Sequence, residues 1–593
     1  MIKRNLSAFV FFGLLSLVIT LPLLKPGYIL TLDMVQVPDP GWPSPWQVSF
    51  PVALLNKLFV LFLPSYWFPK IVLFLVFFLS GVSMATFVGT GNILVNLFAG
   101  TIYTLNPFVY ERVMAGHWYF LLGYALFPWL VKSVVDLFRR PALTSTLKLA
   151  LLATLIFNLF LHFTVIFAVF FVIYAIFFLI VNSRNIKSKL YYYLSLFLFV
   201  IFIFNLNWLL PTLAGKSTIS DSLSSFSRQD LYAFQTVADP QFGLIFNLLS
   251  GFGFWEEVYD YFISQKQIIP FWPLLSLPII ALSIMGLVYL LTKKENWENL
   301  VLNISLLVVF ILALDFAGGI ALKQFAPTVF ALYDRIPILY GLREPQKLVM
   351  LMMFSYAYFG AYGLKWFKSL VKPLAAKLLV IGGFFLIPFV YTPLIFAGFW
   401  GQLKPVFYPE SWYRVSAIIN ADNDNFRMLF LPWHQYLRFN FNHNLVIANP
   451  VPEFFNKPVL ASRNYETRPL YSHDQRPEAL HMEGLFSIQE KKVNLFGQEV
   501  EYPVDWSRDL AIIDIKYIML SKDSDWLKYK FLDDDPELYK QFEDDSLILY
   551  RNLMFGVEPV YPEPEPSPTV ATGSAGLENE ETSTAPAETI EEE

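Results

Sequence analysis

The stretch MIKRNLSAFVFFGLLSLVITLPLL (residues 1–24) decides the fold class, because two basic residues precede a mainly apolar run. An apolar run of about 20 residues is long enough to cross the hydrocarbon core of a bilayer. The stretch also fits a secretory signal peptide, but no A-x-A cleavage pattern follows it. We therefore expect a retained first transmembrane helix with its basic end in the cytoplasm. A cleaved signal peptide is the alternative.

The composition extends the membrane interpretation to most of the chain. Of 593 residues, 55% are hydrophobic and 15% are charged, with a mean hydropathy of +0.49. Because soluble domains carry about 25% charged residues, lipid must be the main solvent. The absence of cysteine excludes disulfides and thiolate metal sites. None of the six histidines forms an HxxH or HExxH pair, and no Walker loop, GxSxG motif or nucleic-acid-binding patch is present.

Eleven apolar runs have roughly the length that a bilayer demands. They are residues 5–24, 69–89, 92–106, 118–137, 143–160, 163–182, 190–210, 270–292, 299–317, 346–364 and 378–398. The fold class predicted from them is an α-helical polytopic membrane protein with about eleven transmembrane helices. The runs 92–106 and 143–160 fit this pattern least well.

Basic residues between these runs indicate how the chain is oriented. Those that fall on one side are Lys3, Arg4, Lys132, Arg139, Arg140, Lys148, Arg184, Lys187, Lys189, Lys293, Lys294, Lys365, Lys368, Lys372 and Lys377. The positive-inside rule makes that side cytoplasmic. The segments 25–68, 106–117, 211–269 and 318–345, and everything after about residue 399, are then extracytoplasmic. Since the inner loops are short and merely basic, any chemistry is expected on the outer face.

The character of the sequence changes at residue 401. Short apolar or alternating runs such as FRMLFLPW, NLVIAN and LAIIDIKYIMLS, separated by Asn, Asp and Pro, predict the strands of a soluble domain. No basic residue follows Arg551, and the Pro, Glu, Ser and Thr of the last segment have little apolar surface to bury. We therefore predict a transmembrane domain at 1–400, an extracytoplasmic α+β domain at 401–556 and a disordered acidic tail at 557–593.

Two carboxylates follow the first span in KPGYILTLDMVQVPDPGWPSPW (residues 25–46). Asp33 is close enough to the span to lie at the lipid–water boundary, where partial desolvation disfavours the charged form and allows a carboxylate to act as a general base. The alternative is that Asp33 only caps or solvates a loop. Asp39, within VPDPGWP, fits a turn residue better. The remainder of this loop is apolar and aromatic enough to hold a helix in the outer interface.

The second outer segment, YTLNPFVYERVMAGHWYFLLGYALFPWL (residues 103–130), contains three titratable residues between apolar runs. In a helix, Glu111 and Arg112 face different directions, so one of them can face the protein interior. The fork of donors on Arg112 suits a phosphate, and His117 could neutralise or protonate a leaving phosphate. The alternative is a Glu–Arg pair with snorkelling side chains and an interfacial His.

A third group lies in LYDRIPILYGLREPQKLVMLMMF (residues 332–354). Arg335, Arg343, Glu344 and Lys347 gather on the non-cytoplasmic side, against the usual charge bias. An anionic lipid phosphate would explain them. The alternative is salt bridging within the loop, either Arg343 with Glu344 or Asp334 with Lys347. The charged loop 211–269 is a candidate lid or acceptor platform, but it contains no specific motif.

These features together resemble the GT-C membrane glycosyltransferases. TLNPFVYERVMAGHWYFLLGYALFPW, YGLREPQKL and the ending IKYIMLS…LILYRN are similar to large bacterial proteins of the YfhO-like kind and to the membrane part of mycobacterial arabinofuranosyltransferases. The resemblance implies that an acceptor hydroxyl attacks a sugar carried on a polyprenyl phosphate, with Asp33 as the base. It also implies that Arg112, His117, Arg343 and Lys347 meet the lipid phosphate, with Asp39, Glu111, Arg335 and Glu344 as secondary residues.

The motif around Asp33 departs from a DxD or ExD pattern, because LDM holds a single acid. We therefore expect an inverting transfer without metal or cofactor, and a bound divalent metal is the alternative. The predicted function is an integral glycosyltransferase of the cell membrane, using a hexose or pentose from a polyprenyl-phosphate donor and an envelope glycan or lipid acceptor. Membrane lipids are expected partners, and nucleic acid is not.

Two functions from other classes stay open. The first is a transporter or flippase of lipid-linked glycans, although transporters usually carry paired charges within their spans. The predicted spans hold almost no charge apart from Asp315. The second is a non-catalytic envelope assembly protein, in which the outer charges would pair only with each other and leave no cavity near Asp33.

Overall fold

The computed structural model describes residues 2–182, 188–217, 219, 223, 226–293, 299–464, 474–490, 493–495, 498–500 and 504–557. Apart from Val557, the predicted tail at 557–593 lies outside the described residues, as do Arg184, Lys187 and Lys294. Residues 1–555 form one unit, which is described below.

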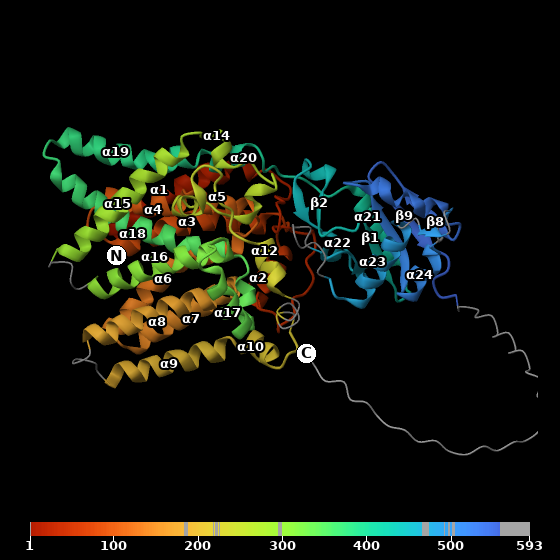
Figure 1. Ribbon diagram of the computed structural model, residues 1–593, viewed down its shortest axis with the longest axis horizontal. Coiled ribbons are helices and arrows are strands. Elements are labelled where there is room, and N and C mark those ends of the chain that lie inside the picture. Colours follow the sequence, from red (N-terminus) through yellow and green to blue (C-terminus); the bar gives the residue numbers. More distant parts are fainter. Residues whose placement is uncertain are drawn as a thin grey trace, which may run out of the picture. The chain divides into compact units, whose positions relative to one another are not determined.

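All eleven predicted apolar runs coincide with helices, which lie side by side as a bundle on the left of Figure 1. They are α1 (Ile2–Thr20), α3 (Trp67–Val88), α4 (Ile93–Thr104), α6 (Trp118–Arg139), α7 (Leu143–Leu159), α8 (His162–Asn182), α9 (Ser188–Phe204), α10 (Leu206–Leu213), α15 (Trp272–Thr292), α16 (Leu300–Gly318), α18 (Val349–Leu370) and α19 (Leu374–Tyr391). The short helix α5 (Pro107–Met114) belongs to the predicted outer segment 106–117. In lipid, helices form because every backbone polar group must be satisfied within the segment.

Length and apolarity separate these helices into two groups. Within the described ranges, eight helices can cross a membrane, or nine if α9 and α10, which are bent by 77°, make one span. The helix α7 is shorter, with 17 residues, and α18 is less apolar because it carries three tyrosines and two lysines. The chain is a multi-pass membrane protein.

The helix α18 lies in the middle of the bundle and packs against α15 through glycines. Every residue from Val349 to Leu364 is buried, so its tyrosines need not face lipid. An added Cβ on Gly286 of α15 would overlap Phe359 O, and one on Gly363 of α18 would overlap Leu282 O. The two backbones are therefore in direct contact, which is the small-residue packing that associates helices in lipid.

Short elements fill the loops at one end of the bundle. They are η1 (Leu21–Leu23), α2 (Phe50–Val60), α12 (Arg228–Ala233), α13 (Gly243–Leu249), η2 (Trp255–Val258), α14 (Gln265–Ile268), η4 (Gly319–Ala321), α17 (Ala326–Arg335), η5 (Pro337–Leu342), η6 (Pro345–Leu348), η7 (Pro393–Ile395) and α20 (Phe396–Trp400). The aromatic side chains of Trp42, Trp46 and Phe62 around α2 stay exposed, and a bilayer interface is the surface that such side chains fit.

The remaining elements form a layered α/β structure, here called the sheet domain. They are α21 (Glu410–Ala421), β1 (Arg427–Leu431), β2 (Tyr436–Arg438), η8 (Asn440–Asn442), β3 (Val446–Ala448), α22 (Val451–Phe454), β4 (Val459–Leu460), α23 (Pro477–Glu490), β5 (Val493–Leu495), β6 (Gln498–Val500), α24 (Trp506–Ile512), β7 (Ile515–Ser521), η9 (Trp526–Asp534), β8 (Leu538–Glu543) and β9 (Leu547–Asn552).

The main sheet has the order β4-β1-β7-β9-β8, with β1 parallel to β4 and β7, and β9 antiparallel to β7 and β8. Its central strand β7 is buried along its whole length, because successive side chains enter different cores. Tyr517 and Met519 pack toward Trp412 of α21, whereas Ile518 packs in the core that contains Leu510 of α24. Helices therefore cover both faces of the sheet.

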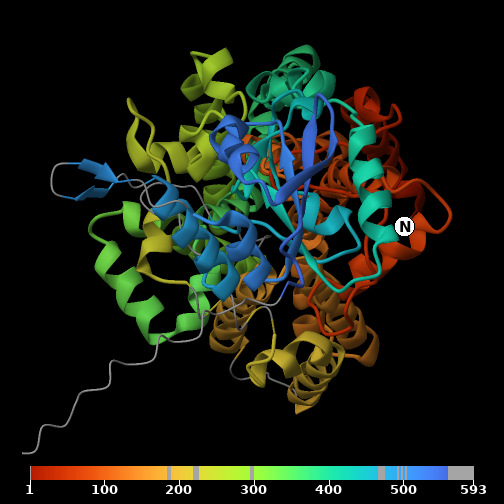
Figure 2. The ribbon, with the colours of Figure 1, turned by 90° about the vertical axis from the view of Figure 1, so that its right-hand side faces the viewer.

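The sheet domain lies over the loop end of the bundle, as the view from that side in Figure 2 shows. The loop after α1 connects the two parts by backbone hydrogen bonds. Tyr28 pairs with Val406, and Leu32 both donates to Val446 O at 3.1 Å and accepts from Ala448 N at 2.9 Å. The residue that follows Leu32 is Asp33, so this pairing fixes the position of the predicted base.

Candidate functional site

Asp33 lies where the loop after α1, the turn between α5 and α6, and the sheet domain meet. Its backbone N–H donates to Ala115 O at 3.2 Å. Its carboxylate accepts one hydrogen bond from Tyr436 O–H at 2.6 Å, and its other oxygen lies 3.0 Å from His117 Nε2. The side chain is 42% exposed, so Asp33 is more hydrated than its place next to a span suggested.

The turn beside Asp33 tolerates only a glycine at position 116. Gly116 has a φ of +78°, and a Cβ there would overlap Met34 N and lie 2.6 Å from Thr31 O. Leu32, with a φ of +34°, also adopts the left-handed region that residues with side chains rarely occupy. Backbone strain of this kind persists only where surrounding structure imposes it, and it gathers at functional sites.

The helix α5 positions two of the predicted site residues. It begins with Asn106, whose side chain accepts from Val109 N at 3.0 Å, and Pro107 occupies its first turn. Arg112 in its last turn and His117 just beyond it then point the same way, with Arg112 Nη1 3.3 Å from His117 Nδ1. Since a guanidinium can only donate, Nδ1 must accept, which leaves the proton on Nε2. His117 is therefore neutral and donates to Asp33, and burial lowers its pKa accordingly.

Glu344 connects the two buried cations of the cluster. One carboxylate oxygen lies 3.3 Å from Arg112 Nη1, and the other lies 2.8 Å from Lys347 Nζ. The side chains of Arg112, Glu344 and Lys347 are 1%, 12% and 4% exposed. Burial opposes ionisation of Glu344, but Lys347 and Arg112 outweigh it and hold the pKa of that carboxyl well below its ordinary value. Two cations against one anion leave the group with a net positive charge.

Arg112 has donors that no described residue uses. Its guanidinium carbon lies 3.9 Å from the centre of the Phe254 ring, and Nη1 contacts His117 and Glu344. Nε and Nη2 are buried and have no hydrogen-bond partner among the described residues. A buried donor without a partner costs about 1–3 kcal/mol, so a bound anion would find these groups already in place.

Other predicted residues lie outside this cluster. Asp39 forms an ion pair with Lys57 at 2.6 Å, and Arg335 is exposed at the end of α17. Glu111 is buried and interacts electrostatically with Glu257 and Lys266 as well as with Arg112. Arg343 lies 4.0 Å from the Phe226 ring and 5.0 Å from the Phe234 ring. The loop pairs predicted as the alternative also differ, because Asp334 pairs with Arg228 and Lys347 with Glu344.

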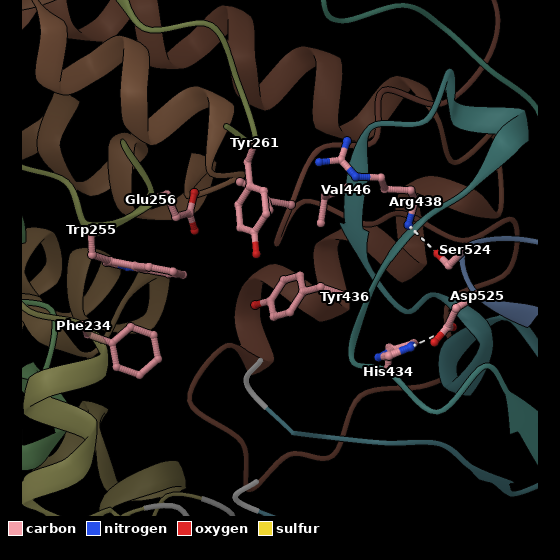
Figure 3. A pocket seen from close by; sticks show the side chains of 11 residues that line it. Phe234, Trp255, Glu256, Tyr261, His434, Tyr436, Arg438, Val446, Ser524 and Asp525 are labelled. Carbon is pink, nitrogen blue, oxygen red and sulfur yellow. Dashed lines mark hydrogen bonds and ion pairs between the residues drawn. The ribbon is translucent and has the colours of Figure 1, made fainter. Parts of the chain in front are cut away.

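A cavity of about 340 Å³ opens beside Asp33, between the bundle and the sheet domain (Figure 3). It is here called the polar cavity because charged and polar side chains share its lining with aromatic and aliphatic ones. Its lining consists of Leu32, Phe234, Trp255, Glu256, Tyr261, His434, Tyr436, Arg438, Val446, Ser524 and Asp525. Leu32 precedes Asp33 in the chain, and Tyr436 donates to it. Burial, together with the charges of Asp33 and Glu344, raises the pKa of Glu256 well above its ordinary value.

An apolar cavity of about 230 Å³ lies among the helices on the other side of the cluster. Side chains of α8, α16, α17 and the start of α18 form it, among them Val169, Leu312 and Leu351. Among the residues that the structure describes, Glu344 and Lys347 are the charged ones in its lining. The charged cluster therefore stands between a polar cavity and an apolar one. No group of three His, Cys, Asp or Glu side chains that could hold a metal was found in the described part of the chain.

Comparison with known proteins shows which fold this is. No family profile matches the sequence, and no curated protein matches it significantly. The mycobacterial arabinofuranosyltransferase AftD superposes with a TM-score of 0.54 at 13% identity, over 93% of this chain and 40% of that chain. An AftD variant gives 0.56 at 13% identity, over 93% and 41%. The chain has a GT-C fold.

The GT-C fold predicted from the sequence is thus confirmed, whereas the YfhO-like subtype stays a prediction. This chain spans about two fifths of the length of the AftD structures. The oligosaccharyltransferase of Archaeoglobus fulgidus has a TM-score of 0.46 at 10% identity, over 92% of this chain and 74% of that chain.

Three residues of the site in this GT-C fold were not singled out from the sequence. Tyr436 contacts Asp33 across 403 positions of the chain, and no local pattern announces such a partner. Phe254 and Glu256 belong to the loop 211–269, which was predicted only as a general platform. The run GFGFWEE (residues 251–257) was the available signal, because glycines and aromatics beside acids are typical of binding loops.

Proposed function

We propose that the chain is an integral membrane glycosyltransferase that transfers a hexose or pentose from a polyprenyl-phosphate carrier to an envelope acceptor. In this proposal it resides in the cell membrane, with its amino terminus in the cytoplasm and its sheet domain outside. The observation that carries the proposal is the continuous chain of contacts from Asp33 through His117 and Arg112 to Glu344 and Lys347. This chain joins the polar cavity to the apolar one.

The apolar cavity suits the isoprenoid part of a donor. Its wall is formed by aliphatic and aromatic side chains of helices in the bundle, and Lys347 stands at its charged end. A phosphate there would meet the ammonium of Lys347 and, next to it, the unused donors of Arg112. The net positive charge of the Arg112–Glu344–Lys347 group matches the negative charge that grows on the phosphate as the sugar leaves.

Asp33 suits the base on the acceptor side. Each carboxylate oxygen has one lone pair left after the bonds from Tyr436 and His117, and the side chain is 42% exposed. An acceptor hydroxyl would give its proton to Asp33 while its oxygen attacks the anomeric carbon. The bond between that carbon and the phosphate oxygen breaks, and its electron pair leaves with the lipid phosphate. A single displacement of this kind inverts the anomeric centre.

The proposed orientation has structural support. The segments predicted to lie outside all contribute to one end of the bundle: Asp33, His117, Glu256 and Glu344 come from four of them and interact there. Between the opposite helix ends, Arg139, which belongs to a segment predicted as cytoplasmic, donates to Asn299, the first residue of the predicted run 299–317, at 3.0 Å.

The non-catalytic alternative also has one observation in its favour, because Arg112, Glu344 and Lys347 already pair with each other. It does not account for the polar cavity beside Asp33. The flippase alternative stays open. The assay described next distinguishes it from a glycosyltransferase, because a flippase moves a lipid-linked glycan across the membrane of a vesicle without changing its covalent structure.

The test is a transfer assay with purified protein in nanodiscs and polyprenyl-phosphate sugars that carry a radiolabel. Asp33→Asn should lower transfer by about 10²–10⁴-fold, the usual contribution of a general base. Asp39→Asn is the matched control, because Asp39 lies in the same loop but pairs with Lys57. Full activity in Asp33→Asn would refute the assigned base, and translocation without transfer would establish the flippase.

A further inference from the structure

The polar cavity has two walls that come from distant parts of the chain (Figure 3). Phe234, Trp255, Glu256 and Tyr261 belong to loops of the bundle, whereas His434, Tyr436 and Arg438 belong to the sheet domain. A volume of about 340 Å³ lies within the range of small-molecule sites, about 300–1,000 Å³. The sheet domain therefore supplies one wall of this site and does not merely cover the bundle.

The apolar part of the lining is aromatic. Phe234, Trp255, Tyr261 and Tyr436 present their rings around the cavity, and Figure 3 shows Trp255 and Tyr261 reaching into it from the bundle side. Rings with a polar edge suit ligands that are apolar on one face and polar at the rim. The C–H face of a sugar ring, surrounded by hydroxyl groups, is such a ligand.

The polar part of the cavity lining contains both positively and negatively charged side chains. His434 Nε2 lies 2.9 Å from Asp525 Oδ1, and Arg438 N donates to Ser524 Oγ at 3.2 Å. Together the guanidinium of Arg438, which donates, and the carboxylate of Asp525, which accepts, can pair with neighbouring hydroxyls of a glycan. Asp525 and the adjacent Asp33 offset the positive charge of Arg438, so the cavity does not favour an anionic ligand.

Glu256 has a buried carboxyl oxygen to which no described residue forms a hydrogen bond. It is 5% exposed, and its Oε2 atom has no hydrogen bond to any described residue. Burial and the neighbouring carboxylates favour its neutral form, which has one O–H donor as well as acceptor capacity. A buried carboxyl without a partner is costly, and a ligand hydroxyl would satisfy both of its functions.

We propose that this cavity binds a neutral glycan acceptor, and that Glu256 hydrogen-bonds a hydroxyl of the sugar unit that presents its attacking hydroxyl to Asp33. The sugar rings stack on Trp255 and Tyr261, and Arg438 contacts the hydroxyls nearer the opening. The role as acceptor rests on the function proposed above. The binding of a neutral glycan does not, because it needs no donor and no transfer.

The test is saturation-transfer NMR on the full chain in nanodiscs, without donor, using short neutral oligomers of mannose, glucose, galactose and arabinose as probes. At least one neutral oligomer should bind saturably. Glu256→Ala and Trp255→Ala should each weaken that binding at least tenfold. Glu256→Gln should retain it, because the amide reproduces the donor and acceptor of a neutral carboxyl. Glu410→Ala, at the exposed start of α21, is the control.

Three results would overturn the proposal. They are no binding of any neutral oligomer to folded protein, binding that Glu256→Ala and Trp255→Ala leave unchanged, and a preference for acidic sugars or peptides. Should the buried substitutions unfold the protein, the exposed Arg438→Gln must still weaken binding. If the glycan still binds and Asp33→Asn leaves transfer intact, the assignment of Asp33 as the base is refuted, whereas the proposed glycan-binding site is not.

Discussion

Replacement of Glu344 by Gln tests the phosphate site without any need for catalysis. In the folded protein its carboxylate is shared by Arg112 and Lys347, both almost fully buried. The amide keeps the size of the side chain but removes the negative charge, so two buried cations lose their counter-ion. Removing one partner of a buried ion pair costs about 3–5 kcal/mol. We expect the lower end, about 3 kcal/mol, because the amide oxygen still accepts one hydrogen bond.

Adding polyprenyl phosphate should then restore much of the stability that Glu344→Gln removes. A ligand at 100 times its dissociation constant stabilises the state that binds it by about 2.7 kcal/mol. In Glu344→Gln the phosphate replaces the missing anion, so the stabilisation by polyprenyl phosphate should exceed that of the unmodified protein at equal concentration. Unfolding in mixed micelles, titrated with dodecyl sulfate, measures both the free energy lost in Glu344→Gln and the free energy gained on adding polyprenyl phosphate.

Two controls make this prediction refutable. Polyprenol, which lacks the phosphate, should stabilise both proteins equally. Asp334→Asn, which breaks the exposed pair with Arg228, should leave the stability close to that of the unmodified protein. If polyprenyl phosphate stabilises Glu344→Gln no more than the unmodified protein, the cluster is only a structural ion-pair group and the donor site must be sought elsewhere.

Two further predictions concern the turn at Asp33 and the sheet domain. Gly116→Ala forces the turn carrying Asp33 to move, so transfer should fall at least tenfold. Gel filtration of the membrane fraction should still show folded protein, and wild-type activity would contradict the close packing. Although burial opposes it, bonds from Lys516 and Tyr517 lower the pKa of Asp422 to about 2. Because this folded-state pKa lies below the ordinary one, the stabilisation is full well above about pH 4 and is lost as pH falls through about 2. Asp422→Asn should therefore cost about 2 kcal/mol at pH 7, and this cost should disappear below about pH 2.

The membrane helices could be predicted because lipid leaves the backbone no other choice. Each apolar run had to satisfy its own hydrogen bonds, and each coincides with a helix. The helix α18 shows the limit of this reasoning, because protein rather than lipid surrounds its tyrosines. Apolarity alone therefore does not decide whether such a helix spans.

The sequence predicts several residues that lie together in the cluster, but it does not predict which residues they contact. Asp33, Arg112, His117 and Lys347 were chosen for their chemistry, and they lie in one cluster. Glu344 does neutralise a neighbour in its own loop, Lys347, but it also reaches Arg112 across 232 positions. Such pairings depend on how helices pack, and no local periodicity encodes them.

The glycine contact between α15 and α18 also bears on how the protein responds to bilayer thickness. Lys347 stands just before the first residue of α18, so its ammonium keeps a fixed height relative to the locked helix pair. In a thinner or thicker bilayer, mismatch is accommodated by tilt or by deformation of the lipid, and sliding of α18 along α15 is not available. The acyl-chain length of the surrounding lipid therefore sets how deep the headgroup region lies relative to Lys347, and this makes membrane thickness a determinant of access to the site.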